Sequence, residues 1–300
     1  MNVAITGSTG LLGSALVPRL TSGGHGVVRL VRGTPAPASA ERVARWDPDT
    51  GAVEPGLDGV DAVVHLAGES VPGGRWTQAR KQRIRDSRVR ATRLFAETLA
   101  RLPRPPRVLV AASAIGYYGD RGDQVLREES PPGVGFLPEV CREWEAAAEP
   151  AARRGIRVVH LRIGLVLSPK GGALAAMLPV FRLGLGGPVG SGAQWMSWIG
   201  MDDMLGAVLH ALMNEALAGP VNAVAPAPVT NREFTKTLAR VLRRPALLPF
   251  PAFAARAVLG QMADELLLAS ARVEPARLQA TGFAFRDATL DGALRRLLGR

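Results

Sequence analysis

The sequence predicts an α/β protein built on a parallel sheet, and three observations lead to that fold class. Short β-branched runs alternate with longer helical patterns through the first half of the chain, as in consecutive βαβ units. The 300 residues are 47% hydrophobic and 21% charged, the composition of a globular protein rather than of a disordered one. After Gly164 the alternation weakens and glycine-rich segments separate shorter helices, which indicates a smaller second lobe.

Five strands and three helices are expected before Gly164. Their residues form short aliphatic runs or amphipathic stretches bounded by glycine, proline and polar residues. The expected strands are Asn2–Thr6, Val27–Val31, Ala62–Leu66, Arg107–Ala112 and Arg157–Ile163. The expected helices are Leu11–Ser22, Thr77–Arg101 and Pro138–Arg154. The prolines between residues 103 and 106 mark a linker, because proline donates no backbone hydrogen bond and disrupts a helix.

Beyond Gly164, the chain is expected to form a substrate lobe and a terminal module. Glycines and prolines separate its segments. The expected features are glycine-rich segments at Lys170–Gly172 and Gly184–Gly192, a strand and loop at Pro220–Pro228, a helical tail at Phe253–Ser270 and a terminal segment at Leu290–Leu298. We therefore predict a domain of residues 1–164 and a lobe of residues 165–300.

A strand that runs into a glycine-rich turn and then a helix opens the chain. Gly7 permits a tight turn, Gly10 lets the backbone approach a pyrophosphate, and Gly13 lets the helix pack closely against the strand. Free N–H groups and the dipole at the helix N-terminus attract the same anion. The turn therefore predicts a Rossmann-type, doubly wound parallel sheet that binds a dinucleotide. The expected contacts in this turn are Gly7, Thr9, Gly10, Leu11, Leu12 and Gly13.

The end of the second strand indicates which dinucleotide binds. Proteins that prefer NAD usually carry an acidic residue there for the ribose 2′-hydroxyl, whereas here Val31 is followed by Arg32. A planar, permanently charged guanidinium suits the 2′-phosphate, so the sequence predicts NADP as the cofactor. The alternative is that Arg32 is one more solvated arginine. Leu66, Ala67 and Gly68 end another strand at the same edge and are expected to lie against the cofactor.

The net charge of +11 does not by itself indicate a nucleic-acid partner. Only 3 of the 37 basic residues are lysines, which leaves 34 arginines spread through every segment. No recognition motif lies beside them, so we do not expect nucleic-acid binding.

The first residues, the lengths of the apolar runs and the single cysteine favour a cytoplasmic protein. The first apolar run begins at Val3, which leaves no room for a signal peptide. No uncharged run approaches the ~18 residues that cross a bilayer, so no membrane partner is expected. The single cysteine, Cys141, cannot form an intramolecular disulfide or a cysteine-rich zinc site, and we expect no metal.

Several ordered motifs resemble one superfamily over essentially the whole chain. They are Gly7 to Gly13, His65–Gly68, Ser113–Asp120, Val140–Glu145, Arg182–Gly192 and Asn222–Pro226. Together they resemble the extended short-chain dehydrogenases/reductases, and more specifically the atypical branch of epimerase family proteins, which is related to NAD-dependent epimerases/dehydratases and to a cell-division-inhibitor-like group. The resemblance implies a further cofactor contact at Arg88 and a family-type C-terminal module over about residues 248–297.

The catalytic pair of that superfamily is missing. Its members carry Tyr-x-x-x-Lys on one helix face, where the lysine lowers the pKa of the tyrosine for proton transfer. Aligned on Glu145, this chain has Leu137 and Cys141 at those two positions. A buried free cysteine usually behaves as a small hydrophobic residue, so a nucleophilic role for Cys141 is less favoured.

Three other residues are expected nearest the nicotinamide. Ser113 is predicted to donate a hydrogen bond to a substrate carbonyl, because it ends a strand at the carboxyl edge of the sheet. Tyr117 or Tyr118 is predicted to donate a proton. The alternative is that Ser113 satisfies a strand end while the two tyrosines pack under a loop.

Two functions from different classes remain open. The first is an NADP(H)-dependent oxidoreductase or epimerase of a small substrate, for which a sugar nucleotide is the superfamily's commonest choice. The second is a nucleotide-binding regulator, for example of cell division, that has lost catalysis. The missing Tyr-x-x-x-Lys pair weighs against turnover but not against binding. The sequence names no substrate and leaves a homodimer open.

Overall fold

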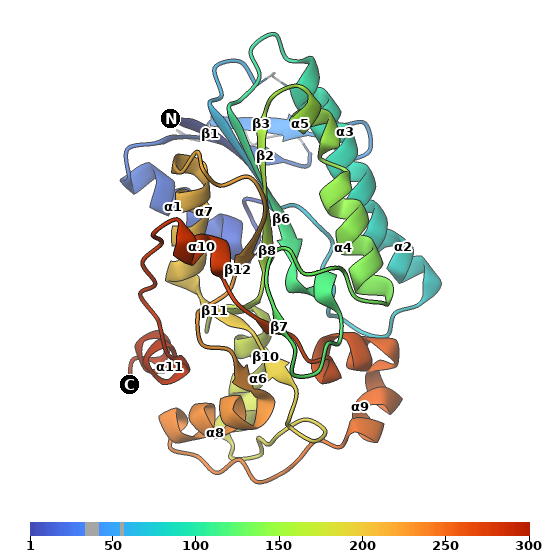
Figure 1. Cartoon of the computed structure of the whole chain (residues 1–300), viewed down its shortest axis with the longest axis vertical. Helices are drawn as coiled ribbons and strands as arrows, with labels where there is room; N and C mark the ends of the chain where they lie inside the picture. Colours follow the sequence, from blue (N-terminus) through green and yellow to red (C-terminus); the bar gives the residue numbers. More distant parts are fainter. Residues whose placement is uncertain (34–41, 55–56) are drawn as a thin grey trace.

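The computed structural model of the chain describes residues 1–33, 42–54 and 57–300, and a large sheet lies at its centre (Figure 1). Its strand order is β12-β8-β6-β5-β1-β2-β3-β4. Neighbouring strands are parallel except β3 and β4. The strands are β1 Asn2–Thr6, β2 Gly26–Val31, β3 Arg42–Trp46, β4 Val53–Glu54, β5 Ala62–His65, β6 Val108–Ala114, β8 Arg157–Ile163 and β12 Gly219–Ala223.

Helices cover both faces of this sheet. In β1, Val3 and Ile5 enter a core shared with α1 and α7, while Ala4 enters a second core shared with α3 and α5. Successive side chains of a strand point to opposite faces, so these two cores lie on opposite sides of the sheet. The predicted Rossmann-type fold is confirmed. The helices are α1 Leu11–Ser22, α2 Gln78–Asp86, α3 Val89–Arg101, α4 Phe136–Ala146, α5 Glu149–Arg153 and α7 Met201–Met213.

The position of the site follows from the strand order. The order reverses at β1, because β5 lies on one side of it and β2 on the other. In open α/β sheets, ligands bind outside the carboxyl ends of the strands at such a point. The glycine turn, the end of β5 and the end of β6 therefore face one crevice.

The smaller lobe packs around its own core, which includes Trp198, Phe234 and Leu294. Its elements and the connecting segments are η1 Ile115–Tyr118, β7 Val125–Leu126, β9 Leu165–Leu167, α6 Gly172–Arg182, β10 Trp195–Met196, β11 Trp198–Gly200, β13 Val229–Thr230, α8 Asn231–Leu242, α9 Ala252–Leu259, the π-helix η2 Ala263–Leu268, β14 Arg272–Val273, α10 Ala276–Ala280 and α11 Leu290–Leu298. Both β12 and α7 return from this half to the main sheet, so the division at residue 164 stays a prediction.

Three expected helices are interrupted in the structure. The stretch predicted as one helix from Thr77 to Arg101 breaks after Asp86, where the Ser87 hydroxyl donates to Ile84 O and accepts from the backbone N–H of Glu69. The helix predicted to reach Arg154 ends at Ala146 and restarts at Glu149, because Pro150 has no N–H with which to continue it. The tail predicted from Phe253 is broken at Gly260, whose φ is +60°.

Two strands of the main sheet, β3 and β4, are absent from the sequence-based expectations. The longer of them, β3, pairs with β2 and buries Ala44 and Trp46, while Arg42 and Arg45 are exposed. Its two arginines weaken the aliphatic signal on which the other strands were predicted. The strand extends the sheet beyond β2, on the side where Arg32 lies.

Candidate functional site

The glycine turn has the geometry of a phosphate-binding loop. Gly7 lies at φ +67°, and a Cβ there would approach Leu66 C and O to 2.8 Å. A Cβ at Gly13 would lie 2.6 Å from Ser8 Cα, so helix and loop touch through their backbones. The first bond inside α1 runs from Ser14 N to Gly10 O at 2.9 Å. The preceding N–H groups of the helix therefore point toward the crevice, and no side chain caps them.

The loop after β5 is held against this turn. Thr6 Oγ1 accepts hydrogen bonds from Leu66 N at 3.1 Å and Ala67 N at 3.2 Å. His65 is buried, with Nδ1 2.8 Å from Thr6 Oγ1 and Nε2 3.0 Å from Thr92 Oγ1. Burial lowers the pKa of His65 to about 4, so the ring stays neutral near neutral pH. The uncharged, buried side chains of Thr6 and His65 thus hold together the glycine turn and the loop after β5, the two segments predicted to contact a cofactor.

A cavity of about 690 Å³ opens beside the glycine turn. This volume lies within the range of ligand pockets in proteins. Its walls come from the first turn of α1, the loop before α6, the start of α7 and the end of α11. The lining residues include Thr9, Gly10, Leu11, Ser14, Ser168, Lys170, Asp202 and Arg296. From the sequence, Lys170 could be either a contact for an anionic ligand or an exposed turn residue, and its place on this wall adds a cation near the N–H groups of the helix N-terminus.

Arg32 lies exposed just beyond the end of β2. An exposed guanidinium at that edge is free to meet a 2′-phosphate, but it is not held in place by the contacts described. A second arginine of the same strand, Arg29, reaches the glycine turn, with its Nε 3.4 Å from the hydroxyl of buried Ser8. Sequence reasoning missed Arg29, although its position three residues before Arg32 places it on the same strand.

Arg88 lies under the loop that follows β5. Its guanidinium donates to Glu69 O at 2.9 Å and to Ile84 O at 3.2 Å, and it stacks 5.1 Å from the ring centroid of Trp144. A Cβ on Gly68 would lie 3.4 Å from Arg88 Cζ. These contacts place Arg88 directly behind a predicted cofactor segment. No carboxylate forms an ion pair with it in the described part of the chain.

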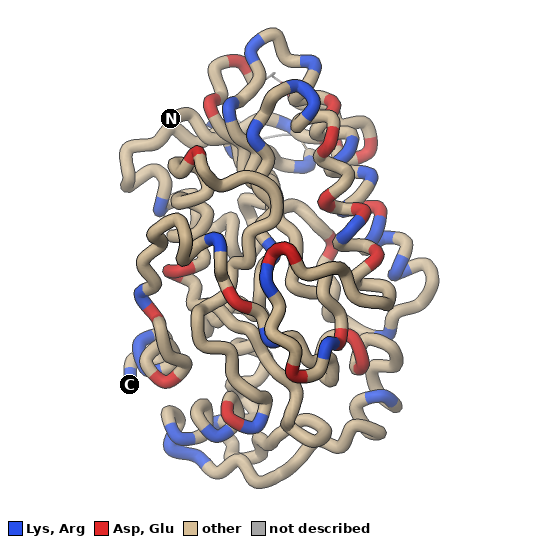
Figure 2. The backbone as a smooth tube through the Cα atoms, in the orientation of Figure 1, with Lys and Arg blue, Asp and Glu red and all other residues tan. Residues whose placement is uncertain are grey.

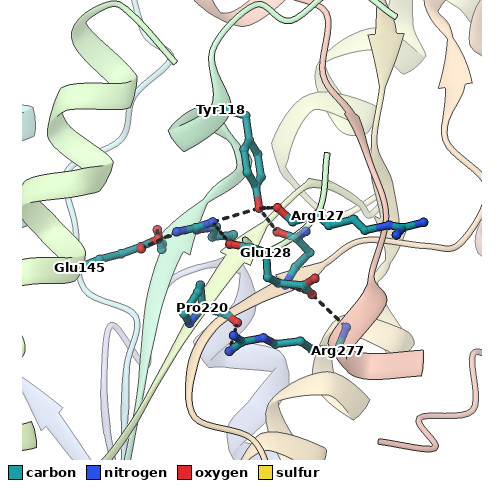
Figure 3. A network of polar contacts seen from close by, with 9 residues as sticks. Tyr118, Arg127, Glu128, Glu145, Pro220 and Arg277 are labelled. Atoms are coloured by element: carbon teal, nitrogen blue, oxygen red, sulfur yellow. Dashed lines mark hydrogen bonds and ion pairs between the residues drawn. The ribbon is translucent and has the colours of Figure 1, made fainter. Parts of the chain in front are cut away.

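Ser113 is buried and joins a polar network around Glu145, which Figure 3 labels. Its hydroxyl donates to Glu145 Oε1 at 2.7 Å. Glu145, on α4, forms a two-pronged ion pair with Arg162 of β8, with both N–O distances at 2.8 Å. A carboxylate can only accept, so the single proton of Ser113 is committed to Glu145. In this arrangement Ser113 has no proton to offer a substrate carbonyl, and it is a positioning residue.

Tyr118 is part of the same network. Its ring is fully buried, and its hydroxyl lies 2.7 Å from Asn222 Oδ1, 3.0 Å from Arg127 O and 3.0 Å from Arg162 Nη1 (Figure 3). Burial raises the pKa of Tyr118 to about 12. Its hydroxyl is therefore engaged by groups inside the protein, which agrees with the alternative that this tyrosine packs under a loop and has a structural role.

Tyr117 is placed differently from its neighbour. Its half-buried ring lies beneath the Arg162 guanidinium, with Cζ 3.5 Å from the ring centroid, and it meets the Tyr118 ring edge to face at 5.3 Å. Within residues 1–33, 42–54 and 57–300, no hydrogen bond to another group engages the Tyr117 hydroxyl. Of the two tyrosines, Tyr117 is therefore the one whose hydroxyl is not engaged by another described group.

The two positions of the usual Tyr-x-x-x-Lys pair are filled by apolar groups. Leu137 and Cys141 lie one turn apart on the face of α4 that packs on Gly116 of η1. Burial raises the pKa of the Cys141 thiol to about 12, so the thiolate is not formed near neutral pH. Leu137 has no proton to donate, and Cys141 stays a buried, protonated thiol rather than a thiolate nucleophile.

A second cavity, of about 290 Å³, lies between this face of α4 and the C-terminal module. The Glu265 carboxylate of η2 accepts from Phe136 N at 3.2 Å and Leu137 N at 2.7 Å, so it caps the start of α4. This cap fixes the module against the helix that lacks the usual pair. Its lining residues are Gly116, Gly119, Asp120, Val134, Leu137, Pro138, Arg256, Asp264, Glu265, Leu268 and Ala269.

Comparison with known protein families gives two matches. Residues 3–223 match the NAD dependent epimerase/dehydratase family. Residues 250–297 match a domain of unknown function, DUF1731, which coincides closely with the C-terminal module expected from the sequence. The first match spans more than half of the chain.

Relatives in several organisms cover nearly the whole chain. An epimerase family protein of Mycobacterium bovis is 45% identical over 293 residues, or 97% of this chain and 96% of its own. The human epimerase family protein SDR39U1 is 37% identical over 301 residues, or 99% and 100% of the two chains. The crystal structure of human SDR39U1 (isoform 2) with NADPH superimposes with a TM-score of 0.92 at 35% identity, covering 100% of both chains.

Proposed function

The chain belongs to the NAD dependent epimerase/dehydratase family, and we propose that it is an NADP(H)-dependent oxidoreductase of a small substrate. The observation that carries this proposal is the glycine turn, whose uncapped helix N-terminus lies beside a cavity of about 690 Å³. The human relative crystallised with NADPH supports the choice of cofactor. NADPH would supply the hydride, and the protein would bind, orient and protonate.

The predicted contacts divide into three groups around the cofactor. The glycine turn and Lys170 would hold the pyrophosphate, because their N–H groups and ammonium line one cavity. Arg32 would meet the 2′-phosphate at the end of β2. Leu66, Ala67 and Gly68 would lie along the sugar, with Arg88 behind them as a fixed cation.

Tyr117 is the residue that we propose as proton donor. Its hydroxyl is not engaged by the described protein groups, whereas those of Ser113 and Tyr118 are. The Arg162 guanidinium lies 3.5 Å from the centre of the Tyr117 ring and would hold that side chain in position.

The cavity beside the C-terminal module is the proposed substrate pocket. Its volume of about 290 Å³ is at the small end of the range for ligand sites. Its walls carry three carboxylates, Asp120, Asp264 and Glu265, and one guanidinium, Arg256. That balance disfavours a diphosphate, so we propose a small uncharged carbonyl or hydroxyl compound rather than a sugar nucleotide.

A specific observation also favours the second candidate, a nucleotide-binding regulator. Ser113, Tyr118 and Cys141 are all buried and held in structural roles. Every member of the usual catalytic set is therefore replaced or occupied, while the cofactor turn is intact. A protein that binds NADPH without turnover would have this combination.

One experiment separates the two candidates. NADPH oxidation is followed with a panel of small aldehydes and ketones, for the parent and for Tyr117→Phe and Tyr118→Phe. We expect turnover in the parent and a fall of at least about 100-fold in Tyr117→Phe, the usual range for loss of a general acid. Tyr118→Phe should lower stability but not the rate per folded molecule. Cofactor titration of each variant confirms that binding is retained. NADPH binding without turnover on any member of the panel would favour the regulator.

A further inference from the structure

Large apolar side chains are exposed on one surface at the end of the molecule remote from the amino edge of the main sheet. Leu247, Phe253 and Leu183 have 82%, 75% and 73% of their surface exposed, and Leu185 and Leu248 about half. Contiguous exposed apolar patches of this kind usually mark interaction sites rather than ordinary protein surface. We call these five residues, Leu183, Leu185, Leu247, Leu248 and Phe253, the apolar end surface.

Two segments that are distant in the sequence build this surface. The loop after α6 and the segment between α8 and α9 run side by side, because Leu248 N donates to Gly186 O at 3.2 Å and Phe250 N to Pro188 O at 2.9 Å. Arg244 Nε also donates to Arg182 O at 2.9 Å. The exposed leucines of both segments therefore lie near one another, on the end of the molecule where Figure 1 shows α6, α8 and α9.

Basic residues surround this apolar surface and acidic residues are missing from its two segments. Residues 170–201 and 234–263 contain no Asp or Glu. Arg182, Lys236, Arg243 and Arg244 are exposed there, and none of the four forms an ion pair in the part of the chain that the structure describes. Blue segments accordingly gather near the lower end of the tube in Figure 2.

We propose that the apolar end surface docks on an anionic lipid bilayer. Exposed leucine and phenylalanine side chains would enter the boundary between headgroups and acyl chains, and the surrounding arginines would meet anionic headgroups. Charge decides against a second copy of this chain, because a twofold contact would bring the same unpaired arginines face to face. The proposal does not depend on the oxidoreductase activity.

This docking is compatible with the other observations on membranes. No helix among the described residues is long and apolar enough to cross a bilayer. The sequence-based expectation of no membrane partner rested on the same criterion, the length of an apolar segment. That criterion tests whether a segment crosses a bilayer and not whether a surface docks on one. A surface assembled from two short segments, 182–185 and 247–253, leaves no long apolar run in the sequence.

Vesicle flotation tests the proposal. Full-length protein is mixed with vesicles of phosphatidylcholine alone or of phosphatidylcholine with 30% phosphatidylglycerol, at low and at physiological salt, and the bound fraction is measured. We expect binding to the vesicles that contain phosphatidylglycerol, weakened by salt. The double variant Leu247→Asp/Phe253→Asp should lose binding at least tenfold. The double variant Arg182→Gln/Arg243→Asn should lose about fivefold per charge, and Asn suits the left-handed backbone at residue 243.

Matched controls keep the result interpretable. Met213→Asp changes an exposed apolar residue at the end of α7, near the amino edge of the sheet, and Arg19→Gln removes an exposed arginine of α1. Neither control should change the bound fraction by more than twofold. All variants should keep the melting temperature of the parent. Absence of binding at low salt would overturn the proposal, as would equal binding by the Leu247→Asp/Phe253→Asp variant. A parent dimer that this variant converts to a monomer, without vesicle binding, would assign the surface to a second copy instead.

Discussion

Removal of the Glu145 carboxylate should destabilise the protein far more than removal of an exposed carboxylate with the same kind of partner. Arg162 has 3% of its side-chain surface exposed and Glu145 13%, so both charges lie out of water. The Glu145 carboxylate accepts hydrogen bonds from Nε and Nη2 of Arg162. The remaining nitrogen, Nη1, donates to the Tyr118 hydroxyl and to the backbone carbonyl of Glu128. Without Glu145, the buried guanidinium has no counter-charge.

The structure sets the size of the expected effect. Breaking a buried ion pair by removing one partner typically costs about 3–5 kcal/mol, because the remaining charge stays buried. The Glu149–Arg153 pair on α5 is the matched control, since its side chains are 51% and 73% exposed. Exposed pairs contribute roughly 0–1 kcal/mol. Glu145→Ala should therefore lower the melting temperature by on the order of 10 °C, and Glu149→Ala by no more than about 4 °C.

Urea denaturation in the absence of cofactor measures both free energies of unfolding. Glu145→Gln should give an intermediate loss, because the amide keeps one acceptor but not the charge. The pair Glu145→Leu/Arg162→Met should recover much of the stability, since it leaves no unpaired charge inside. Equal free energies of unfolding for Glu145→Ala and Glu149→Ala would refute the reasoning, and so would a double variant weaker than Glu145→Ala.

Three further predictions concern the cofactor, the thiol and pH. Arg32→Ala should bind NADPH and NADH with nearly equal affinity in fluorescence titrations, whereas a retained preference would assign the 2′-phosphate to another cation. Cys141, with its pKa raised to about 12, should react with a thiol reagent at neutral pH only as fast as the protein unfolds, and rapid labelling of the native protein would contradict its burial. Burial lowers the pKa of His65 to about 4. As the pH falls from 6.5 toward 4, His65 is protonated in the unfolded chain but not in the native state. The free energy of unfolding therefore decreases over that range of pH. His65→Gln should reduce the stability lost between pH 7 and pH 5 by about 2 kcal/mol in urea titrations. An unchanged loss would mean that His65 is not the group responsible.

Elements with a strong local signal were predicted with their bounds. β1, α1 and β8 have the predicted limits, because each combines a clear periodicity with glycine, proline or polar residues at its ends. The break after Asp86 could not be predicted in this way, since it depends on a hydrogen bond from the backbone of Glu69, 18 residues earlier. Helical periodicity continues through that point.

The parts of the candidate site that lie in one continuous segment could be predicted from the sequence. The parts formed by contacts between distant segments could not. The glycine turn is one continuous segment, and the structure places Leu66 and Ala67 against it, while their contact with the cofactor stays a prediction. The ion pair between Glu145 and Arg162 joins a helix to a strand, and no sequence motif indicates it.

The pocket beside α4 also depends on distant parts of the chain. Glu265 reaches Leu137 across 128 residues. The different places of Tyr117 and Tyr118 follow from the short 3-10 helix η1, in which neighbouring side chains point in different directions. Sequence alone offers no way to choose between two adjacent tyrosines.

The most direct test of the account is calorimetric titration of the parent and of Gly10→Val with NADPH and NADH. Gly10 has φ −76°, which other residues adopt, and a Cβ there would lie 3.3 Å from Gly7 O. The variant should fold if Gly7 O shifts by a few tenths of an ångström, which its melting temperature without cofactor checks, while its branched side chain occupies the place of the pyrophosphate. We predict that the parent binds NADPH more tightly than NADH and that folded Gly10→Val binds neither. A parent that binds no NADPH, or a variant that binds it as tightly as the parent, would contradict the assignment of the glycine turn as the cofactor site.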